Sequence, residues 1–265
     1  MDGSDPLTPV VSDLMERRPV PGMIKVIRFI IRPLLMVLTK RDWQGMENLP
    51  RTGGFVLAPN HISHLDPILI SHFMLDNNIA PRFLGKDTLF DTPVIGWIVT
   101  KAEQIPVYRS TDGAAESLRA AAAAIESGQV ITVYPEGTIT RDPGAWPMSA
   151  RTGAVRLALM TDTPLIPMMQ FGAQEILWPY TKLPKFLPRK TIRIRIGPPI
   201  DLSDLRGKEL TEDLLHEASD RLMDTITQMM VDLRGERPAT PRIDIHTLGR
   251  SRTNYKESSN HEGDA

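Results

Sequence analysis

The sequence predicts a single α/β domain in which helices flank a mostly parallel central sheet, preceded by an N-terminal amphipathic segment. Short β-branched and apolar runs alternate with helical patterns along the chain, which is typical of a parallel sheet with helices on its faces. The length of 265 residues suits one large core, whereas a second independent domain would be cramped. We place the domain at residues 42–234, after an N-terminal segment at 1–41 and before a tail at 235–265.

Each expected strand or helix follows from a local pattern. A β-branched run predicts the strand at residues 130–134, and isoleucines that alternate with arginines predict a half-exposed strand at 192–196. The alanine-rich segment 114–126 stops at Gly128 and is expected to be a helix. Apolar residues at helical spacing make 210–233 an amphipathic helix that packs on the sheet. The other expected strands are 54–59, 82–86, 104–108 and 165–171, and the other expected helices are 67–75, 94–100 and 152–160.

The N-terminal segment contains an apolar stretch, residues 23–38, that is interrupted by cations. Lys25, Arg28 and Arg32 fall within an arc of about 60° on a helix, and apolar residues cover the rest. Such a helix fits a membrane interface, with its cations directed at anionic headgroups; the alternative is a core-packing helix with one solvated edge. Pro33 removes a backbone hydrogen bond, so we expect two short helical pieces. No uncharged run of about eighteen residues occurs, which argues against a spanning helix.

The composition excludes several classes of site and partner. The chain has no cysteine, so a thiolate nucleophile, a disulfide and a cysteine zinc site are excluded, and a reducing cytoplasm is permitted. The formal net charge of −1 argues against nucleic acid as the main partner. The N-terminus lacks the basic start of a secretory signal. Few large apolar residues follow Arg234, so we expect the tail at 235–265 to be disordered or loosely docked.

The segment from Asn60 to Pro67 offers a histidine and a carboxylate where a strand leaves the sheet. On a continuous helix, a spacing of five residues would separate His61 from Asp66 by about 140°. Across a strand-to-helix turn the two side chains can meet, with the carboxylate accepting a hydrogen bond from Nδ1 and Nε2 left as a base. The alternative is a turn histidine beside an ordinary Asp-Pro helix start.

A second candidate segment, Pro135-Glu136-Gly137-Thr138, follows the strand at 130–134. Both segments therefore lie at the carboxyl edge of the sheet, where open α/β folds bind their ligands, and we expect them to share one cleft. A histidine base with its carboxylate, beside an acidic residue in a tight glycine turn, suggests acyl transfer.

Four blocks of the sequence, in order, resemble the motifs of the 1-acylglycerol-3-phosphate acyltransferases of the glycerophosphate acyltransferase superfamily. Residues 60–66 are similar to the histidine-x4-aspartate box, residues 135–138 to the Pro-Glu-Gly-Thr box, and residues 104–109 and 165–167 to two further blocks. The resemblance covers roughly residues 55–170, and four ordered blocks are far more specific than one H-x4-D. It implies transfer of a fatty acyl group from acyl-CoA or acyl carrier protein to lysophosphatidate, giving phosphatidic acid, with no metal or other cofactor.

The resemblance also implies roles for the site residues. His61 would deprotonate the acceptor hydroxyl, Asp66 would hold the imidazole, and Arg109 would bind the acceptor phosphate through the paired donors of its guanidinium. Glu136 would either hold acceptor hydroxyls or fix the loop, and Gly137 would let backbone N–H groups approach phosphate or the oxyanion. The remaining substrate-binding candidates are Asn60, Ser63, Thr138, Arg141 and Arg151.

The sequence departs from the family pattern at one position. Ile139 stands where an arginine usually follows the threonine. Arg141, two positions later, is a candidate to replace that cation. Arg151 is another candidate phosphate ligand, because it precedes a helix start.

Functions of other classes remain as alternatives. The His61-x-x-His64-x-Asp66 spacing superficially resembles a metal-ligand cluster, which would make the protein a metallohydrolase. A serine hydrolase would need a G-x-S-x-G elbow, and the chain has none. A non-enzymatic membrane-surface protein would use the N-terminal helix and the basic residues of 182–190. Within the enzyme class, the alternative acceptors are glycerol 3-phosphate and other lysolipids. We expect attachment to membrane lipids at the cytoplasmic face of the cell membrane.

Overall fold

The computed structural model describes residues 20–108 and 111–247 of the chain. Within this part, the main sheet has the strand order β1-β7-β6-β2-β5. Its strands are β1 (Thr39–Gln44), β2 (Phe55–Pro59), β5 (Val130–Thr132), β6 (Leu165–Phe171) and β7 (Lys190–Ile196). β2 pairs in parallel with β5 and β6, and β1 pairs in parallel with β7, whereas β6 and β7 are antiparallel. The predicted α/β class with a mostly parallel sheet is therefore confirmed.

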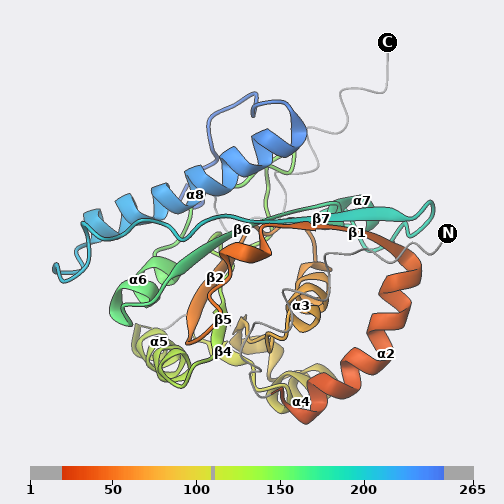
Figure 1. Cartoon of the computed structure of the whole chain (residues 1–265), viewed down its shortest axis with the longest axis horizontal. Helices are drawn as coiled ribbons and strands as arrows, with labels where there is room; N and C mark the ends of the chain where they lie inside the picture. Colours follow the sequence, from red (N-terminus) through yellow and green to blue (C-terminus); the bar gives the residue numbers. More distant parts are fainter. Residues whose placement is uncertain (1–19, 109–110, 248–265) are drawn as a thin grey trace.

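Helices cover both faces of this sheet. They are α2 (Gly22–Leu38), α3 (Asp66–Asp76), α4 (Pro93–Lys101), α5 (Thr111–Glu126), α6 (Gly153–Met160), α7 (Ala173–Ile176) and α8 (Glu212–Arg234), with short 3-10 turns η1 (Met46–Asn48) and η2 (Asp87–Leu89). Figure 1 shows α8 and α6 on one side of the sheet and α3 on the other, with α2 curving outside α3.

The core forms two layers because β2 is apolar on both faces. Val56 packs with α6 and α8 residues such as Leu157 in one cluster. Leu57 points to the other face, where Phe73 of α3 belongs to the second cluster. β2 is fully buried along its length, so the loop that follows it leaves from the centre of the sheet.

β7 shows the expected alternation. Ile194 is fully buried, whereas Arg193 and Arg195 are half-buried on the opposite face. Arg195 is paired with Asp42 of β1 at 2.8 Å.

The strands expected at residues 82–86 and 104–108 form a separate small sheet. They are β3 (Leu84–Lys86) and β4 (Ile105–Val107), which pair in parallel. A single bridge between Phe83 and Thr132 joins this small sheet to β5. α4 lies between β3 and β4 in the chain, so this bridge also connects α4 to the main sheet.

α2 differs from the prediction in two ways. It is one continuous helix across Pro33, so the expected division into two pieces is wrong. Contacts on both sides of the proline hold the axis, because Arg32 Nε donates to Asp76 of α3 at 2.8 Å and Leu35 is buried. Arg28 also pairs with Asp76, at 3.3 Å. Two of the three cations that we expected to face lipid headgroups therefore face the protein.

Several large apolar residues of α2 point outward, whereas Ile24 and Leu35 are buried. Phe29 is 83% exposed and Val37 is 68% exposed, although both are large and apolar. A core-packing helix with a solvated edge would show the reverse arrangement. Within residues 20–108 and 111–247, no helix combines the length and apolar character needed to cross a bilayer.

β1 was not expected from the sequence. Its segment, residues 39–44, is polar and shows no apolar alternation, because β1 is an edge strand with one paired neighbour. The strand begins at Thr39, so the sheet includes residues from the N-terminal segment that we placed at 1–41.

The described start of the C-terminal tail, residues 235–247, docks on the domain. The Ser149 N–H donates to the Ile243 carbonyl at 2.9 Å, Ile245 is 6% exposed, and Arg242 pairs with Asp220 of α8 at 3.6 Å. The rest of the predicted tail lies outside the described residues.

Candidate active site

His61 and Asp66 form the centre of the candidate site. His61 lies in the loop that leaves β2, and Asp66 is the first residue of α3. Nδ1 of His61 lies 2.8 Å from Oδ2 of Asp66. The strand-to-helix turn thus brings together two side chains that a continuous helix would keep apart.

Three donors hold the Asp66 carboxylate. Besides the imidazole, its Oδ2 accepts hydrogen bonds from the N–H of Ile62 at 2.7 Å and of Ser63 at 2.8 Å, and the side chain is fully buried. Its Oδ1 is buried without a hydrogen-bond partner among the described residues. The carboxylate is fixed in place, and its charge can compensate an imidazolium that forms when His61 takes a proton.

Tyr134 covers one face of the His61 ring and was not among the predicted site residues. The ring centroids are 4.0 Å apart and the planes make an angle of 20°. Phe83 stacks on Tyr134 in turn, at 6.0 Å and 12°. The Tyr134 hydroxyl is buried with no partner in the described part of the chain, and burial raises its pKa. The available sequence signal was its position at the strand exit, two residues before Glu136.

Glu136 joins the two predicted segments. Its Oε1 accepts the His61 N–H at 2.8 Å and its Oε2 accepts the Met148 N–H at 3.0 Å. The side chain is fully buried, and this burial raises the pKa of Glu136 to about 8. Both oxygens are engaged by backbone donors, so the geometry favours the loop-fixing role over contact with acceptor hydroxyls.

Gly137 lies beneath the side chain of Arg151. Its φ of +65° is in the left-handed region, and a Cβ at this position would lie 2.9 Å from Cδ and Nε of Arg151. The Gly137 N–H closes a turn by donating to the Tyr134 carbonyl at 3.0 Å, and is therefore not directed at a ligand. Arg151 itself donates its N–H to the Pro135 carbonyl at 2.8 Å, which places its guanidinium beside the glycine turn. Thr138 is half-buried next to this turn.

Asn60 and Ser63 brace the histidine loop. Asn60 Oδ1 accepts the Gln170 N–H at 2.7 Å, and Gln170 Nε2 donates to the Asn60 carbonyl at 2.9 Å. Ser63 Oγ donates to the Leu177 carbonyl at 2.8 Å. Both side chains are fully buried in these contacts, which support the loop rather than present a polar group to a substrate.

The cationic candidates differ in how the structure places them. Arg109 lies outside the described residues. Arg141 is half-buried, and its N–H donates to Met148 Sδ at 3.3 Å. Ile139 is 5% exposed, and its carbonyl accepts the Tyr180 hydroxyl at 2.8 Å. The position that carries an arginine in the family pattern is therefore part of the core here, and Arg151 is the candidate that lies against the Glu136-Gly137 turn.

The His61-x-x-His64-x-Asp66 spacing of the metallohydrolase alternative does not assemble a cluster in the described part of the chain. The His64 ring meets Tyr180 edge-on, with centroids 6.5 Å apart, while His61 turns to Asp66. Across residues 20–108 and 111–247, no group of three or more His, Asp or Glu side chains is placed to hold a metal ion.

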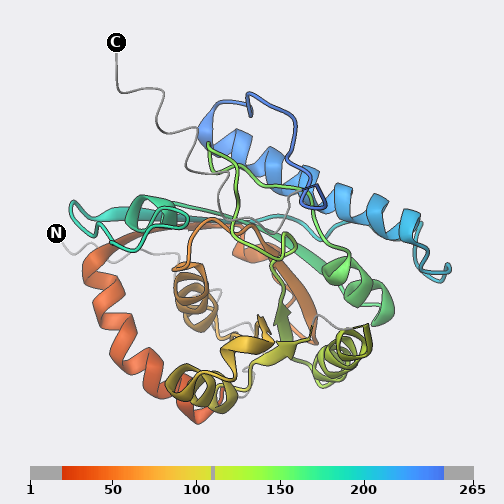
Figure 2. The same ribbon diagram turned by 180° about the vertical axis from the view of Figure 1, so that it is seen from behind.

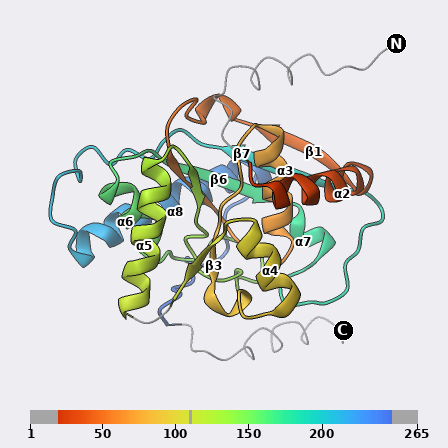
Figure 3. The same cartoon turned by 90° about the horizontal axis from the view of Figure 1, so that it is seen from below.

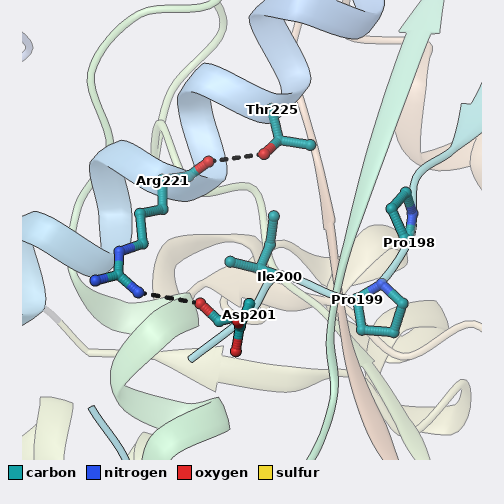
Figure 4. Close-up of a pocket in the computed structure, with 6 residues that line it drawn as sticks. All are labelled: Pro198, Pro199, Ile200, Asp201, Arg221 and Thr225. Carbon is teal, nitrogen blue, oxygen red and sulfur yellow. Dashed lines mark hydrogen bonds between the residues drawn. The ribbon is translucent and has the colours of Figure 1, made fainter. Parts of the chain in front are cut away.

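The surface cavity shown in Figure 4 is separate from these residues. It has a volume of about 290 Å³ and lies between the segment after β7 and α8. Its Arg221 side chain is engaged with Asp204 at 2.7 Å. The lining residues are Pro198, Pro199, Ile200, Asp201, Arg221 and Thr225. None of them is a predicted site residue.

Comparisons with known proteins find relatives of this chain. The chain is 29% identical to the chloroplastic 1-acyl-sn-glycerol-3-phosphate acyltransferase BAT2 of Brassica napus, over 52% of this chain and 39% of that protein. It is 28% identical to the 1-acyl-sn-glycerol-3-phosphate acyltransferase of Bacillus subtilis (strain 168), over 55% of this chain and 71% of that protein. The chain thus spans about two fifths of the length of the Brassica napus relative.

A solved structure has the same fold. The crystal structure of the 1-acyl-sn-glycerophosphate (LPA) acyltransferase PlsC from Thermotoga maritima matches with a TM-score of 0.58 and 19% identity, over 82% of this chain and 81% of that chain. Residues 40–170, which include His61, Asp66 and Glu136, match the model of the Acyltransferase family. This chain belongs to the acyltransferase family.

Proposed function

We propose that this chain transfers a fatty acyl group from a thioester to the free hydroxyl of 1-acylglycerol 3-phosphate, giving phosphatidic acid. The observation that carries this proposal is the 2.8 Å contact between His61 Nδ1 and Asp66 Oδ2, which leaves Nε2 as the nitrogen that can act as a base. The names of the Brassica napus and Bacillus subtilis relatives support the acceptor.

The reaction needs no acyl-enzyme. His61 Nε2 takes the proton of the acceptor hydroxyl, and the oxygen attacks the thioester carbonyl carbon. The tetrahedral intermediate collapses with cleavage of the carbon–sulfur bond, and the imidazolium returns the proton to the leaving thiolate. Asp66 compensates the imidazolium charge throughout, because it is buried against Nδ1. Base catalysis together with positioning can supply several orders of magnitude in rate.

The acceptor phosphate needs a cation near the dyad. Arg151 is the best placed of the described candidates, because its side chain lies over Gly137, next to the residue that holds the His61 backbone. Arg109 and Arg141 remain further candidates. We expect Arg151→Ala to raise the KM for the phosphorylated acceptor about 10- to 100-fold with little change in the KM for the thioester, since a lost charge-assisted phosphate contact costs about 1.5–3 kcal/mol. An unchanged acceptor KM would remove Arg151 from the site.

Membrane attachment fits the proposed substrate, which is an amphiphile. The outward apolar residues of α2 are placed to enter the interface of a bilayer, while Arg28 and Arg32 stay paired with Asp76. We propose attachment at the cytoplasmic face of the cell membrane, in keeping with a chain that has no cysteine.

A thiol-release assay with lysophosphatidate and oleoyl-CoA tests the proposal. We expect release of one thiol per phosphatidate formed, and loss of this activity in His61→Ala. His64→Ala is the matched control, because His64 lies in the same loop but its ring faces Tyr180. Undiminished turnover in His61→Ala would refute the mechanism. A panel with glycerol 3-phosphate, other lysolipids and acyl carrier protein thioesters identifies the preferred acceptor and donor.

A further inference from the structure

α4 presents apolar side chains to the outside of the molecule. Val94 is 69% exposed, Ile95 is 49% exposed and Trp97 is 56% exposed. The segment from Pro93 to Thr100 contains no charged residue. Gly96 is the buried residue of the helix, and a Cβ there would lie 2.0 Å from the Phe90 carbonyl. This close contact seats α4 on the chain before it and leaves the large apolar residues facing outward.

α4 lies beside the first turns of α2. The two helices are in contact, and Ile24 of α2 packs with Leu75 and with Ala102, which directly follows α4. Figures 1 and 2 show α4 beside the lower end of α2 from both sides of the molecule. We call the outward side chains of the two helices the α2–α4 surface. Its members include Phe29, Ile30, Val37, Val94, Ile95 and Trp97.

The charges around the α2–α4 surface indicate what it contacts. Arg28 and Arg32 are held by Asp76, whereas Lys25 is exposed one turn before Phe29 and is a single cation at the edge of the surface. The ends of the α4 segment carry charges of both signs, such as Asp91 and Lys101, which gives no net attraction for a polyanion. A surface made of aliphatic side chains with a phenylalanine and a tryptophan fits the boundary between hydrocarbon and headgroups of a lipid bilayer.

We propose that the α2–α4 surface inserts into one leaflet of a phospholipid bilayer, with α4 as a second inserting element beside α2, and that apolar contact rather than charge drives the insertion. This inference rests on the proposed function, because the acceptor of that reaction resides in a membrane. It differs from the expectation that cations of the N-terminal helix recognise anionic headgroups.

The proposed contact also brings the candidate site to the membrane. α4 follows β3, and Phe83 immediately before β3 stacks on Tyr134, which stacks on His61. An aromatic stack of three rings therefore links the segment before β3 to His61. An α4 inserted in the leaflet would hold His61 near the surface where a lysophosphatidate presents its hydroxyl.

Trp97 is a built-in reporter for the first test. Of the four tryptophans, the other three are buried or half-buried. We expect vesicles of brominated-chain phosphatidylcholine to quench part of the emission of the full-length protein, and Trp97→Phe to lose most of that quenching. Equal quenching of the two proteins would overturn the role of α4.

Vesicle flotation of two matched variants gives the second test. Ile95→Glu places a charge on the α2–α4 surface, whereas Met160→Glu changes a side chain of nearly equal exposure, 48% against 49%, at the end of α6. Figure 3 shows α6 on the opposite side of the molecule from α2 and α4. We expect Ile95→Glu to weaken binding to phosphatidylcholine vesicles at least ~10-fold and Met160→Glu to leave it unchanged. Equal loss in both variants would refute the surface.

Changes in lipid composition and salt distinguish apolar insertion from electrostatic attraction to anionic lipid. We expect similar binding to zwitterionic and anionic vesicles, with little loss in high salt. Binding that requires anionic lipid and disappears in salt would overturn the apolar mechanism. A concentration-dependent dimer that Ile95→Glu converts to a monomer would instead assign the surface to a second copy. If lipid quenched Trp97 only after deletion of residues 1–19, the occupant of the α2–α4 surface would be that segment and not a bilayer.

The flotation and quenching results can be interpreted independently of the proposed acyl-transfer reaction. Flotation and quenching need no turnover, so they can fail while acyl transfer succeeds. With short-chain lysophosphatidate and short-chain acyl-CoA in solution, Ile95→Glu should retain wild-type thiol release, because the Ile95 side chain is exposed and is not one of the candidate site residues. Absence of thiol release in the wild type with every acceptor would refute the proposed function and leave the vesicle results unaffected.

Discussion

The imidazole of His61 stacks on the phenol ring of Tyr134, with centroids 4.0 Å apart and planes 20° from parallel. Asp66 fixes one edge of the imidazole through Nδ1, and Tyr134 fixes its face. The two contacts together determine where Nε2 points. In the proposed reaction, a base held in this way would lose little entropy when it meets the acceptor hydroxyl.

Substitution of Tyr134 separates the ring from its hydroxyl. We expect Tyr134→Phe to retain nearly full kcat, because the hydroxyl has no partner among the described residues. Tyr134→Leu should lower kcat about 2- to 10-fold, the range that corresponds to an aromatic stack of about 0.5–1.5 kcal/mol, with a smaller effect on the KM for the thioester. Steady-state thiol release measures both constants. A loss of kcat in Tyr134→Phe as large as in Tyr134→Leu would contradict the positioning role.

Asp66 should be required for catalysis in its charged form. Asp66→Asn keeps the size of the side chain but removes the charge that compensates the imidazolium, so we expect kcat to fall at least ~100-fold. Asp66→Ala should in addition destabilise the fold by about 2–4 kcal/mol, because the N–H groups of Ile62 and Ser63 would lose their shared acceptor. Urea denaturation and thiol release measure the two effects. Exposed Asp91→Asn is the control, and an active Asp66→Asn would rule out the dyad.

Glu136 should make stability depend on pH. Burial raises its pKa to about 8 from 4.5, so between these values the folded protein binds a proton that the unfolded chain has released. The free energy of unfolding should therefore fall as the pH rises from about 4.5 to about 8, by at most ~1.4 kcal/mol per pH unit.

Glu136→Gln tests this dependence. The amide cannot accept from both the His61 and Met148 N–H groups, so we expect a loss of about 1–3 kcal/mol at pH 5 and a flatter pH profile up to pH 8. Urea denaturation at several pH values measures the slope, and exposed Glu126→Gln should leave it unchanged. Parallel profiles for wild type and Glu136→Gln would show that Glu136 does not titrate in this range.

Asp76 should stabilise the position of α2 on α3. It pairs with Arg28, Arg32 and Arg41. Burial raises the pKa of Asp76, but the contacts with His72 and Arg32 outweigh it, so the pKa is lowered. Its contribution is therefore present above the unfolded value of 3.8 and is lost as the pH falls below it.

Replacement of this carboxylate measures the contribution. We expect Asp76→Ala to lower the free energy of unfolding at pH 7 by about 1–2 kcal/mol, since several charge-assisted hydrogen bonds to partly exposed arginines are lost. Asp220, an exposed carboxylate that pairs with Arg242, provides the matched control. Asp220→Ala should lower the free energy of unfolding by less than about 1 kcal/mol. Equal costs for the two variants would mean that Asp76 is an ordinary surface acid.

Local sequence patterns predicted the elements of the domain well. The buried apolar run of β2, the alternation of β7 and the amphipathic pattern of α8 each reflect contacts that every residue of the element makes with one neighbouring layer. The polar edge strand β1 was missed, because its pairing with β7 comes from residues about 150 positions away. The continuity of α2 across Pro33 was missed for a related reason, since the contacts on either side of the proline outweigh the lost backbone bond.

The sequence by itself determined the fold class and the pair of His61 and Asp66, because a strand-to-helix turn is a local structure that the Asp-Pro start already indicates. It also placed Glu136 at the same sheet edge. Only the tertiary structure decided that Glu136 braces the His61 backbone, that Tyr134 covers the imidazole, and that Arg28 and Arg32 are paired within the protein. These contacts join segments some 40 to 75 residues apart. Their geometry depends on how the layers pack, which no local pattern encodes.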